Sequence, residues 1–209
     1  MNYDEFPVMN NGYLVVPKPC ELLLDHDLIY ERFCSAIYMA ANVNGEAGVH
    51  LSRLVNEEVA MKAYFRAALA EFVSLEDALK VNGYPEASAF SITKSSNPLF
   101  HIMKLLRDYN IHLGITELKE TEVIVSLESD SSQLFGCSAS VIKNLNFCDL
   151  KKLRNARFYS DQELFQMVKM FNEQQQKFGV GDLIIKGLVM YSELVGQLLT
   201  KHLRVIPNA

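Results

Sequence analysis

One short segment of the chain carries two residues that could cleave RNA. Arg107 and His112 lie five positions apart, and Asp108 directly follows the arginine. An arginine can hold a phosphate group, and a histidine can accept or donate a proton near neutral pH. Together they are sufficient for cutting RNA without a metal ion. The competing interpretation is a surface arginine and a histidine at a helix end, where the helix dipole favours a cation.

The element that must position this pair is predicted to be a helix over residues 98–113. Asn97 offers a capping side chain, Pro98 suits the first helical position, and Gly114 suits a C-terminal stop. At about 100° per residue, one stripe of this helix is apolar and is expected to face the core. The stripe consists of Leu99, Ile102, Met103, Leu106, Tyr109 and Leu113.

The candidate residues border that stripe. Arg107 and His112 fall on opposite flanks, and Asp108 is expected on the outward face, one turn before His112, where a carboxylate can orient an imidazole. Leu105 and Ile111 also point away from the stripe, so the helix should be covered twice, by another part of the chain or by a second subunit. Because the pair is too far apart to converge easily on one phosphate, we expect a homodimer that assembles a cleft from two copies.

The run Arg-Asp-Tyr-Asn-Ile-His at 107–112 resembles the R-x4–6-H motif of the HEPN superfamily, in its form of arginine, polar residue, three further residues and histidine. A long helix rich in alanine and glutamate, here expected over 49–81, also precedes the motif helix in that family. The resemblance covers residues 22–115. It implies a dimerising helical bundle that acts as a metal-independent endoribonuclease of the toxin or defence type, with an antitoxin or another protein as a further partner.

The same resemblance assigns roles to the residues. It implies that Arg107 and His112 are the catalytic pair, that Asp108 assists them, and that the 2′-hydroxyl of the RNA attacks its own phosphate. No cofactor would take part. Many members of the superfamily are non-catalytic binding modules, so the alternative function is a helical adaptor that binds protein partners.

The fold class predicted for the whole chain is mainly α: a HEPN-like antiparallel helical bundle with a short β element and a C-terminal helical extension. Residues 1–21 are expected to be an irregular lead-in, because prolines and Asn-Gly interrupt them. Residues 22–115 should form the bundle, 116–159 a strand and loop insertion, and 160–209 C-terminal helices that pack on the same domain.

Finer predictions concern five segments. Helical spacing of apolar residues predicts a helix over 22–43. Alternation predicts a strand over 119–127, followed by a polar loop over 128–132. Ser160 to Glu163 resembles a capping box at the start of a helix that runs to about residue 178. The glycines at 179 and 181 predict a break before a last helix over 182–203.

The net charge of −5 and a pI near 5.6 argue against nucleic-acid binding through total charge, so RNA contact requires a local basic patch. The region 141–159 could provide one, with Phe147 and Phe158 placed to stack on bases. A run of this kind is more often a solvated face. The RNA-binding candidates are Lys151, Lys152, Arg154 and Arg157.

Metal and membrane sites find little support in the sequence. The four cysteines form no CxxC pair and no metal-like spacing with the five histidines. His101 shares the outward helix face with Asp108 and His112, but at i, i+7 and i+11 the three cannot converge on one ion. The first residues are polar and acidic, and no apolar run approaches the roughly 20 residues of a membrane span. We therefore expect a cytoplasmic protein that binds no metal and no membrane.

Overall fold

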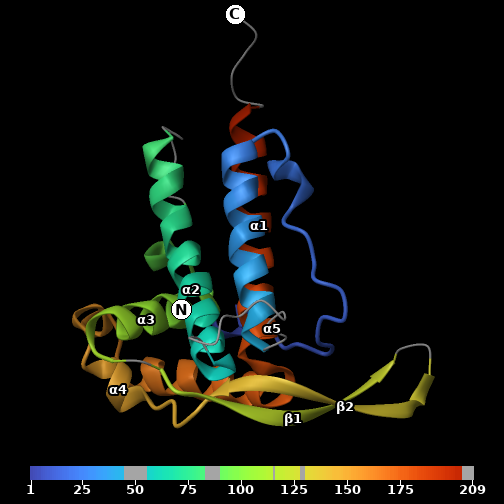
Figure 1. Cartoon of the computed structure of the whole chain (residues 1–209). Helices are drawn as coiled ribbons and strands as arrows, with labels where there is room; N and C mark the ends of the chain where they lie inside the picture. The colour runs from blue at the N-terminus through green and yellow to red at the C-terminus, as the bar shows by residue number, and fades with distance from the viewer. Residues whose placement is uncertain (45–55, 83–89, 115, 128–129, 204–209) are drawn as a thin grey trace, which may run out of the picture.

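The computed structural model of the chain describes residues 1–44, 56–82, 90–114, 116–127 and 130–203. These residues are mainly helical, with a small two-stranded antiparallel sheet, as the sequence predicts (Figure 1). The main elements are α1 (Asp27–Ala41), α2 (Glu57–Val81), α3 (Pro98–His112), β1 (Leu118–Leu127), β2 (Asp130–Ile142), α4 (Phe147–Lys151) and α5 (Asp161–Leu203). Short 3₁₀ turns connect them: η1 (Tyr3–Glu5), η2 (Glu21–Leu23), η3 (Asn42–Asn44), η4 (Ile92–Lys94) and η5 (Arg154–Phe158).

Two helix starts confirm the capping predictions. At α3, the Asn97 side chain accepts a hydrogen bond from the backbone N–H of Leu99, and Pro98 occupies the first turn. At α5, the Ser160 hydroxyl accepts from the backbone N–H of Glu163, whose carboxylate accepts in turn from the backbone N–H of Ser160 at 2.8 Å. Each cap gives a partner to a backbone group that the helix itself leaves unpaired.

The first two long helices begin later than predicted. Helix α1 begins at Asp27, and the turn η2 precedes it. Helix α2 begins at Glu57, because Asn56 has an extended backbone and its side chain caps the backbone N–H of Val59. The predicted helix residues before Asn56, namely 49–55, lie outside the described part of the chain.

The core lies where four helices meet around one tyrosine. The Tyr191 ring, on α5, packs at centroid distances of 5.4 Å from Phe72 of α2, 5.4 Å from Phe100 of α3 and 5.8 Å from Phe33 of α1. Its hydroxyl donates to the carbonyl oxygen of Phe90 at 2.7 Å, so the one polar atom of this buried ring has a partner. This cluster joins α3, which carries the candidate residues, to the rest of the bundle.

Helix α5 changes direction at Gly179, as the predicted break requires (Figure 1). Gly179 has a φ of 84°, a left-handed conformation that favours glycine. A Cβ at this position would also lie 2.9 Å from the Cβ of Ala139, on β2. The glycine therefore permits both the bend and the close passage of the hairpin.

One 18-residue window of α5, within Asp161–Thr200, is long and apolar enough to cross a membrane by length and composition alone. About half of that window, 56%, is buried inside the structure. The central helix of a protein core has the same composition, because both environments exclude polar side chains. The helix packs on α1, α3 and β2.

The sheet is larger than the short β element that the sequence predicts. The predicted strand is confirmed as β1, but the loop predicted over 128–132 is wrong, since β2 begins at Asp130 and runs to Ile142; residues 128 and 129 lie outside the described chain. The register pairs Leu118 with Ile142 and Ile124 with Gly136. The apolar residues of β2 do alternate, at 135, 137, 139 and 141, but the residues between them are glycine and serine, which are also typical of loops.

Candidate functional site

Helix α3 is buried on more sides than its apolar stripe predicts. Leu105, expected away from the core, is 1% exposed, and Asp108 and His101, both expected on the outward face, are 2% and 4% exposed. Ile111, on the side that was also expected to be covered, is 57% exposed. The outward placement of Asp108 and His101 is wrong, because α3 contacts α2, α4 and α5 of its own chain. For Leu105 the same contacts select one of the two expected covers, another part of the chain. The second cover of the helix thus comes from within the chain, and Leu105 is not available to a second subunit.

Arg107 forms an ion pair with its neighbour in the sequence. Its Nη1 donates to Oδ1 of Asp108 at 2.7 Å, and Nδ2 of Asn155, in η5, donates to the other carboxylate oxygen at 2.7 Å. The Arg107 side chain is 28% exposed, whereas that of Asp108 is 3% exposed. The buried carboxylate is therefore held by a cation on one side and an amide on the other, which ties α3 to η5.

His112 ends α3 and is exposed. Asp108 does not orient it, because the recorded partners of both carboxylate oxygens are Arg107 and Asn155. The predicted relation between Asp108 and His112 is therefore wrong. The helical spacing is compatible with that relation, but Arg107 occupies one carboxylate oxygen and the packing of η5 against α3 brings Asn155 to the other.

Arg107 and His112 nevertheless line one pocket, of about 270 Å³, between α2, α3 and η5. We call it the α2–α3 pocket. It is open to solvent on one side, and its lining is mostly charged. The lining residues are Val73, Glu76, Asp77, Lys80, Lys104, Arg107, Asp108, His112 and Asn155.

Glu76 organises the α2 side of this pocket. Its buried carboxylate accepts from Lys80 at 3.0 Å, from Lys104 at 3.3 Å and from the Ser91 hydroxyl at 2.8 Å. Burial by itself would raise the pKa of Glu76, but the hydrogen bonds from Lys80 and Ser91 and the charges of the two lysines lower it overall. The carboxylate is thus ionised and fully engaged.

The charges of the pocket balance before His112 is counted. Its three carboxylates, from Glu76, Asp77 and Asp108, face three cations, from Lys80, Lys104 and Arg107. Apart from His112, the charged side chains that line the pocket therefore sum to zero.

His101 does not line the α2–α3 pocket, and its side chain makes structural contacts. One ring nitrogen lies 2.7 Å from the Tyr159 hydroxyl and the other 2.7 Å from the carbonyl oxygen of Ser95. Burial lowers the pKa of His101 and raises that of Tyr159 to about 12. The pair holds α3 against the segment before α5.

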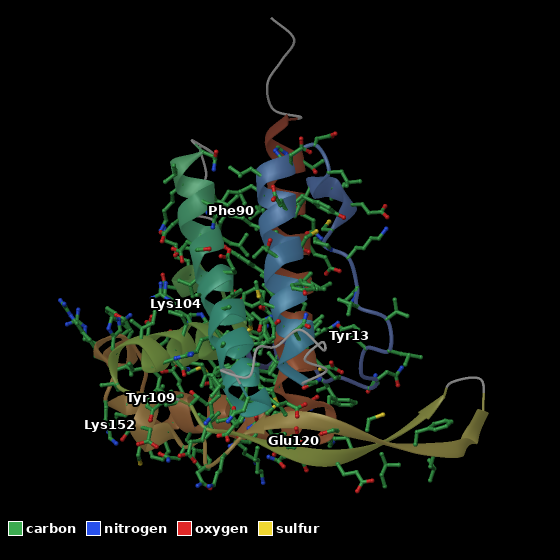
Figure 2. All side chains as sticks on the ribbon, viewed as in Figure 1. Tyr13, Phe90, Lys104, Tyr109, Glu120 and Lys152 are labelled. Carbon is green, nitrogen blue, oxygen red and sulfur yellow. The ribbon has the colours of Figure 1, made fainter. Side chains whose placement is uncertain are left out.

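The four predicted RNA-binding cations, Lys151, Lys152, Arg154 and Arg157, all lie exposed on or next to α4 and η5. Lys151 pairs with Asp161 at 2.6 Å and Lys152 with Asp149 at 2.7 Å, while the Arg157 guanidinium stacks 5.0 Å from the ring centre of Phe158. Arg154 forms no ion pair with the described residues. The same turn supplies Asn155 to the pocket, so this basic segment adjoins it. Figure 2 shows Lys104, Tyr109 and Lys152 on the side of the molecule where α3 and α4 lie.

Metal ligands do not gather in the described part of the chain, where no group of three His, Cys, Asp or Glu side chains is placed to hold an ion. The four cysteines, Cys20, Cys34, Cys137 and Cys148, are free thiols.

Sequence reasoning missed most of the pocket. Glu76 and Lys80 are four positions apart on α2, a spacing that indicates an ion pair on a helix but not its role in a site. Lys104 reaches Glu76 from 28 positions along the chain, and Asn155 reaches Asp108 from 47. Contacts at such separations leave no signal in local periodicity.

Comparison of the chain with models of known protein families, with characterised proteins and with solved structures finds no match in any of the three.

Proposed function

We propose that the chain is a metal-independent endoribonuclease whose active site is the α2–α3 pocket. The observation that carries the proposal is that Arg107 and His112, on opposite flanks of one helix, line the same open pocket within a single chain. The site therefore needs no second subunit to complete it. The resemblance of residues 107–112 to the HEPN motif supports the same reaction, and with it a toxin or defence role with an antitoxin partner.

In this mechanism the 2′-oxygen of the RNA attacks the adjacent phosphorus, and the bond to the 5′-oxygen breaks. The products are a 2′,3′-cyclic phosphate and a 5′-hydroxyl, and the proton lost from the 2′-hydroxyl is balanced by the one gained at the leaving oxygen. His112 transfers one of these protons. Arg107, through its exposed part, and Lys104 stabilise the charge on the phosphoryl oxygens.

The surroundings of the pocket favour an extended strand over a small ligand. Arg154 and Arg157 lie exposed on η5, the turn whose Asn155 lines the pocket, and Phe158 beside them is 70% exposed. Arginines contact successive phosphates and an exposed ring stacks on a base. RNA bound in the pocket would continue over η5.

A second function, a non-catalytic helical adaptor, is favoured by the ion pair of Arg107 with buried Asp108. That pair, with Asn155, joins α3 to η5 and gives the arginine a structural role that requires no substrate. In this case the charges of the pocket would only hold the bundle together.

The experiment that separates the two is RNA cleavage by the purified full chain in EDTA, with analysis of the product ends. We expect 2′,3′-cyclic phosphates, and a loss of about 10²–10⁴-fold in His112→Gln, the range for a general acid or base. Ile111→Ala, which changes the exposed neighbour of His112 outside the pocket, should cleave like the parent. Both substitutions are at exposed positions and should alter the free energy of unfolding by less than about 1 kcal/mol.

Two results would favour the adaptor. One is His112→Gln cleaving as fast as the parent, since no proton would then pass through this side chain. The other is cleavage that appears only when Mg²⁺ or Mn²⁺ is added.

A further inference from the structure

The hairpin is longer than the body of the protein can cover. Its base is buried, with Val141 and Ile142 at 0% and 4% exposure. Beyond it, apolar side chains lie in solvent: Ile124 is 71%, Leu134 67% and Phe135 43% exposed. Figure 1 shows this part, which we call the distal hairpin (residues 122–127 and 130–138), projecting away from the helices. An isolated two-stranded ribbon of this kind has little stability of its own.

At the base, side chains act as a third strand along the outer edge of β2. The Gln175 side chain accepts from the backbone N–H of Ile142 at 2.8 Å and donates to its carbonyl oxygen at 3.5 Å. The Asn44 side chain accepts from the backbone N–H of Ser140 at 3.1 Å. These backbone groups point away from β1 and would otherwise be unpaired in the core.

The same edge continues without caps into the distal hairpin. Because alternate residues of a strand direct their backbone groups to the same side, those of Leu134, Gly136 and Ser138 point outward like those of Ser140 and Ile142. Within the described part of the chain, the outward backbone groups of these three residues form no hydrogen bond. Regular pairing ends beyond Leu134, where the register shifts opposite Ser126 and Leu127. The open edge therefore consists of three positions centred on Gly136.

We propose that this edge pairs antiparallel with the same edge of a second copy of the chain, with the twofold axis at Gly136. Gly136 then exchanges two backbone hydrogen bonds with its own copy, and Leu134 exchanges two with Ser138 of the second copy. The cap on Ser140 ends the pairing on each side. Gly136 places no side chain of its own at the axis, and the Glu122 side chain that lies over it in the single chain is flexible. The two hairpins then become a four-stranded sheet.

The distribution of charge favours a second copy of the chain as the partner, and the edge of β2 over the edge of β1 as the contact. Residues 134–142 of β2 carry no charge of their own, so two copies of this edge meet without repulsion once the flexible Glu122 side chain, which lies over Gly136, turns toward solvent. The outward positions of β1 include Glu120 (labelled in Figure 2) and Glu122, which would face like charges if β1 paired with its own copy. In a chain of net charge −5, the β2 edge is the neutral one.

The proposed register places Phe135 opposite Cys137 of the second copy, in a pair that lacks mutual hydrogen bonds and brings Cα atoms to about 4.5 Å. Oxidised Phe135→Cys should therefore form a covalent dimer, and mass spectrometry of its peptides should link positions 135 and 137. The two positions are too far apart on one strand to join within a chain. Ile124→Cys, on the other strand of the same hairpin, is the control and should give no link between 124 and 137 of two chains.

Sedimentation of the full chain tests the edge without cysteine chemistry. Gly136→Pro removes the N–H at the axis but none of the bonds to β1, and the atom nearest its Cβ belongs to the flexible Glu122 side chain. We expect a dimer in the parent and a dissociation constant at least tenfold higher in the variant. A second variant, Leu134→Lys combined with Ser138→Lys, sets lysines of the two copies opposite each other. It should weaken the dimer to a similar extent, and it covers the case in which proline disturbs the hairpin itself.

A parent that is monomeric at tens of micromolar overturns the proposal. So does a dimer that both edge variants leave intact, because another surface would then hold it. Neither result bears on RNA cleavage, since the α2–α3 pocket is complete within one chain.

Discussion

The α2–α3 pocket and the distal hairpin differ in how far their polar groups find hydrogen-bond partners within the chain. In the pocket, each buried carboxylate has partners from the chain: Glu76 has two lysines and a serine, and Asp108 has Arg107 and Asn155. Along the hairpin, side chains satisfy the outer edge of β2 only as far as Ser140. The carboxylates of the pocket are therefore paired before any ligand arrives, and among the described residues there only the buried Nε of Arg107 lacks a partner, whereas the hairpin leaves several backbone groups unpaired.

The same contrast separates the two proposals. A preorganised pocket suits catalysis, because its dipoles need not be reoriented during the reaction. An open strand edge suits recognition, because main-chain hydrogen bonds form with any strand in register. Substitutions that break the buried ion pairs of the pocket should therefore destabilise the folded monomer strongly, and substitutions at the exposed end of the hairpin should destabilise it little.

The largest effect is expected from Arg107→Ala. It leaves the buried Asp108 carboxylate without its cation, which costs about 3–5 kcal/mol in free energy of unfolding. The helical pattern alone places Arg107 at the edge of the core and predicts a change no larger than about 1 kcal/mol. Denaturation in urea measures the difference. Arg154→Ala, at an exposed arginine on η5, should change stability by less than about 0.5 kcal/mol, and a small loss in both would contradict the structural role of the pair.

Gln175→Ala tests the capped part of the hairpin edge. The substitution leaves the buried N–H of Ile142 without its acceptor and should cost about 1–3 kcal/mol. Amide hydrogen exchange at Ile142 should quicken as well. Gln176→Ala, at the exposed next residue, should do neither. Equal behaviour of the two variants would mean that water satisfies the edge as well as Gln175 does.

Glu76→Gln should change the response of stability to acid. In the folded chain the pKa of Glu76 lies below its ordinary value of 4.5, so near that pH the unfolded chain binds more protons. Stability from Glu76 is therefore fully present above pH 4.5 and is lost as the pH falls through the lowered pKa. The variant should show a shallower loss between about pH 5 and pH 3 in thermal melts. Glu31→Gln, at an exposed glutamate of α1, should keep the slope of the parent.

The smallest effect is expected from Leu134→Ser in the distal hairpin. Leu134 is 67% exposed, so its replacement in the monomer should change the free energy of unfolding by no more than about 0.5 kcal/mol. Measurement at low protein concentration, where any dimer dissociates, isolates this value. A loss of 2 kcal/mol or more would show that the body of the protein covers the end of the hairpin.

Local signals in the sequence predicted the elements near the site well. The cap at Asn97, the proline after it and the capping box at Ser160 predicted two helix starts, because such signals act over three or four residues. The break at Gly179 was predicted for the same reason. Strand β2 was missed, since Gly136, Ser138 and Ser140 separate its apolar residues with side chains typical of loops.

The sequence by itself determined that the chain is mainly helical, where α3 begins and ends, and that Arg107 and His112 lie on its flanks. These properties follow from interactions between residues a few positions apart. Only the tertiary structure decided that Asp108 is buried, that Lys104 and Asn155 join the pocket, and that Leu105 is covered by its own chain. Those outcomes depend on which segments pack together, because burial and ion pairing arise between residues far apart in the sequence.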